Sequence, residues 1–106
     1  MICSKQFENA LIEYKNLGKD DINVYKDNII VVLDDLNFSL DKLKHSLIKY
    51  LTKEGFECFD TEKYLGANPI IKMYDEYFVL KMEFGGSWVM PYQNAILTPL
   101  DKGSAL

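Results

Sequence analysis

The 106-residue sequence contains no arginine and a single histidine, so all twelve of its strongly basic residues are lysines. Arginine supplies the planar fork that reads guanine or clamps phosphate through two hydrogen bonds. The 16 acidic residues outnumber the lysines and give a formal net charge of −4. Because proteins that bind the phosphate backbone are normally basic, the sequence argues against nucleic acid as the partner.

Long apolar runs and targeting signals are also missing. The longest apolar run, Ile29–Leu33, is far shorter than the roughly 20 residues that span a bilayer. The first eight residues lack the charged stretch, apolar run and cleavage site of a secretory signal. Cys3 and Cys58 have no close spacing, so two reduced thiols are expected rather than a disulfide. We expect a cytoplasmic protein that does not bind a membrane.

Residues suited to catalysis are scarce. His45 falls off the apolar stripe of its predicted helix, and no cysteine or histidine lies at ligand spacing from it. Cys58 alternates onto a buried strand face, where a thiol acts as an apolar filler. Asp34 and Asp35 follow an apolar strand and, with Asp41, form the oxygen set that Mg²⁺ prefers, but turn formation and capping explain the same residues. We expect no enzyme, no cofactor and no metal site, with a magnesium-dependent hydrolase or transferase as a minor alternative.

The composition that is present, 48% hydrophobic and 13% aromatic, suits one compact core. We therefore expect a single domain over residues 1–106. Residues 99–106 are small and polar enough to form a flexible tail.

Two amphipathic helices are predicted from apolar residues at i, i+3, i+4 and i+7 spacing. The first covers residues 7–17, with Ser4 as N-cap and Gly18 as the stop. The second covers residues 40–53, begins at a cap from Ser39 or Asn37, and ends before Gly55. Its solvent side is expected to carry four lysines, which are Lys42, Lys44, Lys49 and Lys53.

Strands are predicted from runs rich in β-branched and aromatic residues. Residues 28–33 predict a central strand, and residues 56–59 a short strand parallel to it, adjacent or with one strand between them. Residues 70–74 and 77–84 predict a hairpin around Asp75–Glu76, residues 87–90 a further strand, and residues 60–69 a surface loop. The expected fold class is α+β, with both helices packed on one face of a mixed, mostly antiparallel sheet of four to five strands in the order α-β-α-β-β-β.

The charge pattern is more informative than any motif. The stretch from Asp20 to Asp41 holds six aspartates against one lysine, Lys26. A second acidic group surrounds Asp60 and Glu62. If the two groups share an edge of the sheet, they form an acidic rim that suits a basic protein surface. The alternative is the ordinary charged exterior of a soluble protein.

Tyrosine and tryptophan strengthen the protein-binding interpretation, because these residue types are typical of interface hot spots. They are also ordinary strand residues. The expected partner-binding residues are Asp20, Asp21, Asp34, Asp35, Asp41, Asp60, Glu62, Tyr64, Trp88 and Tyr92.

In size and charge alone, the chain is similar to small immunity proteins. This comparison and the acidic surface predict a protein-binding domain that neutralises a basic partner by occlusion, as an immunity protein, antitoxin or phage inhibitor does. A nuclease toxin is one such partner, because its substrate-facing surface is positive. The alternative is a ligand-sensing or oligomerising regulatory domain of ferredoxin-like architecture, for which self-association is expected.

Overall fold

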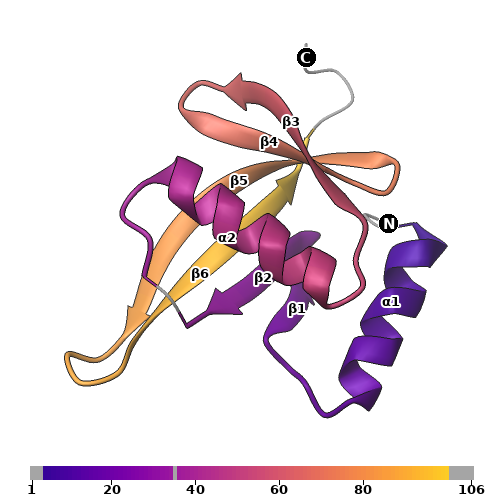
Figure 1. Cartoon of the computed structure of the whole chain (residues 1–106), viewed down its shortest axis with the longest axis horizontal. Helices are drawn as coiled ribbons and strands as arrows, with labels where there is room; N and C mark the ends of the chain where they lie inside the picture. The colour runs from indigo at the N-terminus through magenta and orange to yellow at the C-terminus, as the bar shows by residue number, and fades with distance from the viewer. Residues whose placement is uncertain (1–3, 35, 101–106) are drawn as a thin grey trace.

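The structure, a computed structural model, describes residues 4–34 and 36–100. Its helices are α1 (Lys5–Asn16) and α2 (Leu40–Lys53) (Figure 1). Its strands are β1 (Ile22–Tyr25), β2 (Asn28–Leu33), β3 (Cys58–Leu65), β4 (Asn68–Met73), β5 (Glu76–Gly86) and β6 (Pro91–Pro99). These strands form one six-stranded sheet in the order β1-β2-β6-β5-β4-β3. The α+β class is confirmed, but the sheet has more strands than expected and pairs antiparallel throughout rather than as a mixed sheet.

The connection through α2 differs from the expected unit. Because every neighbouring pair is antiparallel, β2 and β3 do run in the same direction, but β6, β5 and β4 lie between them. The prediction of adjacent strands, or of one strand between them, was therefore wrong. The middle of the sheet is taken by β5 and β6, the longest strands, so α2 must cross the sheet to reach β3 at the far edge.

The first strand, β1, was not predicted. Only Ile22 among its four residues is buried, so the strand has too little apolar alternation to detect. Its hairpin with β2 turns through Lys26 and Asp27, which both have positive φ (48° and 67°). Such turns usually carry Asn-Gly or Asp-Gly, and neither pair is present to mark this one.

The predicted surface loop over residues 60–69 is instead a hairpin of β3 and β4 that turns at Gly66, whose φ is +64°. Strand β3 is polar because it is an edge strand with most of its residues exposed. The next hairpin, β4–β5, is confirmed, but its register pairs Met73 with Glu76, so the turn is Tyr74–Asp75.

The predicted strand over residues 87–90 was also wrong. These residues form the loop between β5 and β6, and the last strand begins at Pro91, a position where proline costs no ladder hydrogen bond. At the other end of β6, Pro99 still pairs with Phe78, and the Leu100 N–H donates to the Tyr77 carbonyl at 2.9 Å. The expected tail therefore starts inside β6, and its residues 101–106 lie outside the described residues.

Both helices form where the sequence predicts. The Ser4 hydroxyl accepts a hydrogen bond from the Phe7 N–H, and Ser39, rather than Asn37, caps α2. In α2, Leu43, Leu47 and Leu51 are fully buried against the sheet. Neither described helix is long and apolar enough to cross a membrane.

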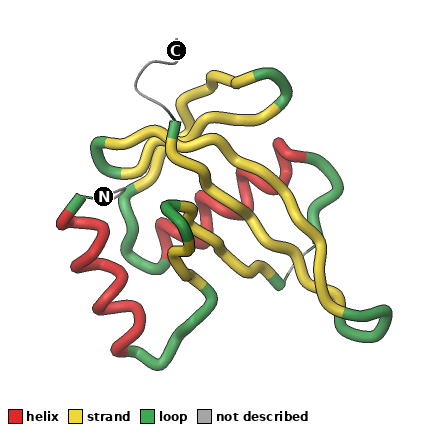
Figure 2. Tube along the Cα trace, turned by 180° about the vertical axis from the view of Figure 1, so that it is seen from behind, coloured by secondary structure: helices red, strands yellow, loops and turns green. Residues whose placement is uncertain are grey.

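The core lies between α2 and one face of the sheet, and α1 closes one end of it. The Phe7 ring packs on Phe56 and Tyr74, and the Tyr14 ring also contacts Phe56. Figure 2 views the molecule from behind and so shows the opposite face of the sheet, which no described helix covers. Residues Ile30, Val32 and Ile96 are only half-buried on that face.

Candidate functional site

The predicted partner-binding residues do not form one continuous rim. Asp21 precedes β1 and Asp34 follows β2, at one edge of the sheet, whereas Asp60, Glu62 and Tyr64 belong to β3 at the opposite edge. Trp88 and Tyr92 belong to the β5–β6 hairpin, and Asp35 lies outside the described residues. The candidate residues thus divide into three separate groups.

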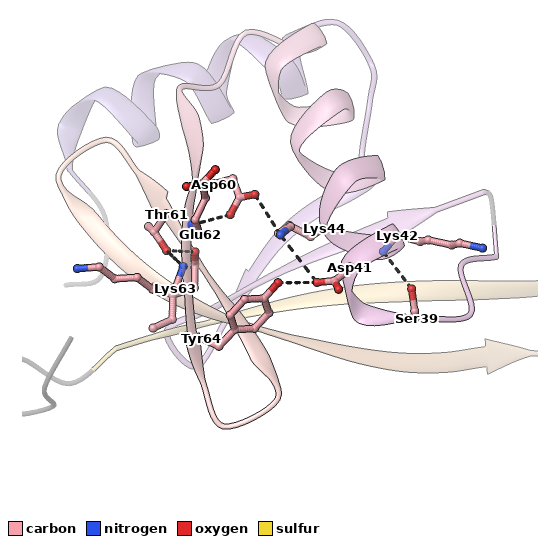
Figure 3. Close-up of polar contacts among 10 residues, drawn as sticks. Ser39, Asp41, Lys42, Lys44, Asp60, Thr61, Glu62, Lys63 and Tyr64 are labelled. Atoms are coloured by element: carbon pink, nitrogen blue, oxygen red, sulfur yellow. Dashed lines mark hydrogen bonds and ion pairs between the residues drawn. The ribbon is translucent and has the colours of Figure 1, made fainter.

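The group on β3 surrounds Lys44, which is buried, with 6% of its surface exposed, although its position was predicted to face solvent. Figure 3 shows the Lys44 side chain running from α2 to Asp60, at a Nζ–Oδ2 distance of 3.0 Å. Asp41 Oδ1 lies 3.8 Å from the same ammonium and accepts a hydrogen bond from the Tyr64 hydroxyl at 2.8 Å. The ammonium also lies 5.5 Å from the centre of the Tyr64 ring. We call Asp41, Lys44, Asp60 and Tyr64 the Lys44 cluster.

A bulge in β3 aims Asp60 at Lys44. The strand register shifts between Asp60 and Lys63, and Glu62 between them has a φ of +62°. The Glu62 N–H donates to Asp60 Oδ1 at 2.8 Å. Bulges commonly re-aim a side chain in this way.

The pKa shifts of Lys44 and Asp60 show that each of these two groups stabilises the charged form of the other. Burial alone would lower the pKa of Lys44, but the interactions with Asp60, and then with Tyr64, together outweigh it and raise that pKa. Burial likewise tends to raise the pKa of Asp60, yet the Glu62 N–H and Lys44 together hold it below its ordinary value. The charge of Asp60 is therefore already compensated by Lys44, and the cluster joins the start of α2 to β3.

The second group lines a groove of about 320 Å³ on the other side of α2. Asp21 and Asp34 come from the sheet edge, and Tyr50 comes from the helix. We call this the Asp21 groove; its remaining lining residues are Val32, Leu33, Ser46, Lys49 and Lys53.

Hydroxyl groups hold the wall of the Asp21 groove in place. The Tyr14 and Tyr50 hydroxyls lie 2.6 Å apart, and the Asp21 N–H donates to the Tyr14 hydroxyl at 3.2 Å. The Asp21 carbonyl accepts the Val32 N–H at 2.8 Å. The backbone of Asp21 is thus fixed from two sides, while its carboxylate remains at the groove.

The carboxylates of Asp21 and Asp34 make no ion pair with the described residues. Partial burial, and then the charges of Asp20 and Asp34, raise the pKa of Asp21, against a smaller lowering by Lys15. Within residues 4–34 and 36–100, no ion pair includes Asp20, Asp21 or Asp34. The neighbouring Lys19 pairs with Glu54 instead. Asp21 and Asp34 thus have no ion-pair partner among the described residues, although Lys49 and Lys53 also line the groove.

The third group is apolar. Trp88 is fully exposed at the tip of the β5–β6 hairpin. The Tyr92 ring lies against Gly85 on the neighbouring strand, so closely that a Cβ at Gly85 would be 2.5 Å from it. Tyr92 therefore supports the hairpin while remaining 41% exposed.

The residues considered for chemistry do not assemble in the described chain. His45 is exposed on α2. Cys58 is buried beside the Ile48 carbonyl, and burial raises the pKa of its thiol, as expected for an apolar filler. Within the described residues, no three histidine, cysteine, aspartate or glutamate side chains come together as metal ligands.

Lys44 and Gln93 were missed as organising residues. Lys44 lies four residues after Leu40 and three before Leu47, so the helical repeat itself places it on the inner face. Gln93 is fully buried and its amide bonds the backbone N–H and carbonyl of Asn37, which ties the loop before α2 to β6. Gln93 alternates with Ala95 and Leu97, a signal that was present in the sequence.

Comparison with known proteins gives no relative: no family model, curated protein or solved structure matches this chain.

Proposed function

We propose that this protein is an acidic binding domain that docks onto a basic protein and neutralises it by occlusion. The observation that carries the proposal is that Asp21 and Asp34 line a groove without an ion pair among the described residues, where the pKa of Asp21 is raised. A lysine or arginine side chain of a partner would enter beside Asp21 and Asp34 and pair with them.

The contrast between the two acidic groups supports this choice. Asp60 already holds Lys44 at 3.0 Å, so a partner would have to displace an existing ion pair to use it. Asp21 has a raised pKa because of burial and of like charges nearby. A cation from a partner would relieve that repulsion, which makes docking at the groove favourable.

The groove also has the shape and the chemistry for a long basic side chain. Leu33 and Tyr50 line it and supply apolar surface. These groups suit the apolar stem of a lysine or arginine, whose charged end would reach the carboxylates.

No observation supports the regulatory alternative in the same way. It rested on a β-α-β unit with adjacent strands or one strand between them, and three strands separate β2 from β3.

The test is capture of a basic protein from a lysate of the source organism at low salt, followed by elution with a salt gradient. The groove variant is D20N/D21N/D34N. The matched control removes the same number of charges at exposed positions elsewhere, and is E13Q/D27N/D75N. We expect wild type and control to retain the same basic protein, and the groove variant to lose it at low salt.

Retention that falls equally in both variants would contradict docking at the groove, because it would reflect net charge alone. Failure of the wild type to retain any basic protein would contradict the proposed function itself. Circular dichroism of each variant checks that the fold is intact.

A further inference from the structure

The β5–β6 hairpin ends in an apolar tip formed by Trp88, Val89 and Met90. Their side chains are 101%, 87% and 76% exposed. Figure 1 shows the hairpin extending beyond the rest of the sheet, clear of both helices. Single exposed apolar residues are ordinary, but three in succession at a projecting tip indicate a contact surface.

Hydrogen bonds between Ser87 and Met90, and the backbone conformation of Gly86, fix the shape of this tip. The Ser87 N–H donates to the Met90 carbonyl at 3.3 Å, and the Met90 N–H donates to the Ser87 hydroxyl at 3.2 Å. Gly86 has a φ of +86°, and a Cβ there would lie 2.3 Å from the Met90 carbonyl oxygen. A tip held in this way loses little conformational entropy on binding.

The tip lies at the same end of the sheet as Asp34. Leu33 pairs with Gln93, so the chain leaves β2 at Asp34 beside the start of β6. The two hydrogen bonds between Gln93 and the Asn37 backbone hold the following loop at that end too, where Phe38 is 84% exposed. Asp34, which lines the groove, therefore lies at the end of the sheet from which the apolar tip projects.

The charge around the apolar tip indicates whether the tip binds a protein or a membrane. No charged residue occurs between Glu83 and Asp101, and the whole chain has a net charge of −4. Proteins that bind anionic lipid headgroups place lysine or arginine beside the inserting apolar residues. Asp34, which follows β2, and Glu83 on β5 lie toward this end of the sheet, and their negative charge favours a positive surface.

From these observations we infer that the β5–β6 tip inserts Trp88 into an apolar pocket of the same basic partner whose cationic side chain enters the Asp21 groove. The inference rests on the proposed function. Tryptophan and methionine suit such an anchor, because tryptophan fills a pocket with little loss of entropy and methionine adapts to its walls. The groove then supplies the electrostatic attraction and the tip supplies the buried contact.

The experiment measures the Kd of wild type and variants for the captured partner over a range of salt concentrations. Trp88→Ala removes the anchor, and Phe59→Ala is the matched control, an aromatic residue 54% exposed on the opposite edge strand. We expect Trp88→Ala to weaken binding about 30-fold or more, the range of a hot-spot residue. Its slope of log Kd against log salt should remain that of the wild type, and Phe59→Ala should bind as the wild type does.

A second variant, Gly86→Ala, keeps Trp88 but forces the tip out of its closed conformation, so it should also weaken binding. If the wild type binds the basic partner with the expected salt dependence and Trp88→Ala binds equally well, this inference fails while the proposed function stands. If no basic protein is retained at all, both fail.

Two further measurements test whether the tip binds a membrane or a second copy of the chain instead. Sedimentation with neutral phosphatidylcholine vesicles that depends on Trp88, while partner binding does not, would overturn the inference in favour of a membrane. Dimerisation of the free protein that depends on Trp88, again with partner binding intact, would overturn it in favour of a second copy.

Discussion

Replacing Lys44 by methionine removes the buried cation that joins α2 to β3 but keeps most of the apolar stem. The lost contacts are the 3.0 Å bond to Asp60, the weaker approach to Asp41 at 3.8 Å and the position 5.5 Å from the Tyr64 ring centre. We expect Lys44→Met to destabilise the fold, because Asp60 then keeps its charge without its cation.

The magnitude follows from the burial of the pair. A hydrogen bond to a charged group contributes about 1.5–3 kcal/mol, and the Asp60 side chain is 30% exposed, so water recovers part of its solvation. We therefore expect a loss of about 1–2 kcal/mol in the free energy of unfolding, which lowers Tm by about 5–10 °C in a chain of this size.

The pH dependence gives the sharper assay. The pKa of Asp60 is lowered in the folded protein, so its ionised form stabilises the fold above the unfolded pKa of about 3.9. That contribution is lost as the pH falls through the lowered folded pKa. Urea unfolding of wild type and Lys44→Met should therefore differ more at neutral pH than at a pH well below about 3.9.

A double-mutant cycle with Asp60→Asn isolates the interaction free energy between Lys44 and Asp60. The reasoning is refuted if Lys44→Met is as stable as the wild type at neutral pH. It is also refuted if the difference in stability is the same at both pH values, because the loss would then come from packing alone.

Three further predictions follow from single contacts. Gln93→Leu should lower the free energy of unfolding measured in urea by about 1–3 kcal/mol, because it removes the two hydrogen bonds between the Gln93 amide and the Asn37 backbone, and hydrogen exchange should rise in the loop before α2; unchanged exchange would contradict it. Gly85→Ala should lower Tm because a Cβ meets the Tyr92 ring at 2.5 Å, and Tyr92→Ala should restore part of the loss in the double variant, whereas additive losses would disprove that contact. The Cys58 thiol should react with a disulfide reagent far more slowly in the native protein than in urea, because it is buried and its pKa is raised; equal rates would show that it is accessible.

The helices could be predicted from the sequence because their signals are local. Ser4 and Ser39 cap the helices, and Gly18 and Gly55 follow their ends in the positive-φ conformation that stops a helix. The strand order could not be predicted, because pairing depends on partners distant in the chain. β1 has one buried residue and β3 is a polar edge strand, so neither gives the alternation of a half-buried strand. Residues 87–90 show the reverse error, since they favour a strand locally but pair with no other strand.

The candidate site shows the same division between local and distant information. The composition identified acidic and aromatic residues, but not that Asp21 and Asp60 lie at opposite edges of the sheet. Nor did it show that Lys44 compensates Asp60 while Asp21 makes no ion pair with the described residues. That difference depends on the bulge at Glu62 and on the crossing of α2, and both are consequences of tertiary structure.

The most direct test of the account is an NMR titration of the Asp21 carboxyl in the free protein and in the complex with the captured basic partner. We expect the pKa of Asp21 to lie above its ordinary value in the free protein, because burial and the charges of Asp20 and Asp34 raise it. In the complex it should fall below the ordinary value, since the cation of the partner favours the ionised form. An Asp21 pKa that is unchanged by binding would show that the partner docks elsewhere and would contradict the account.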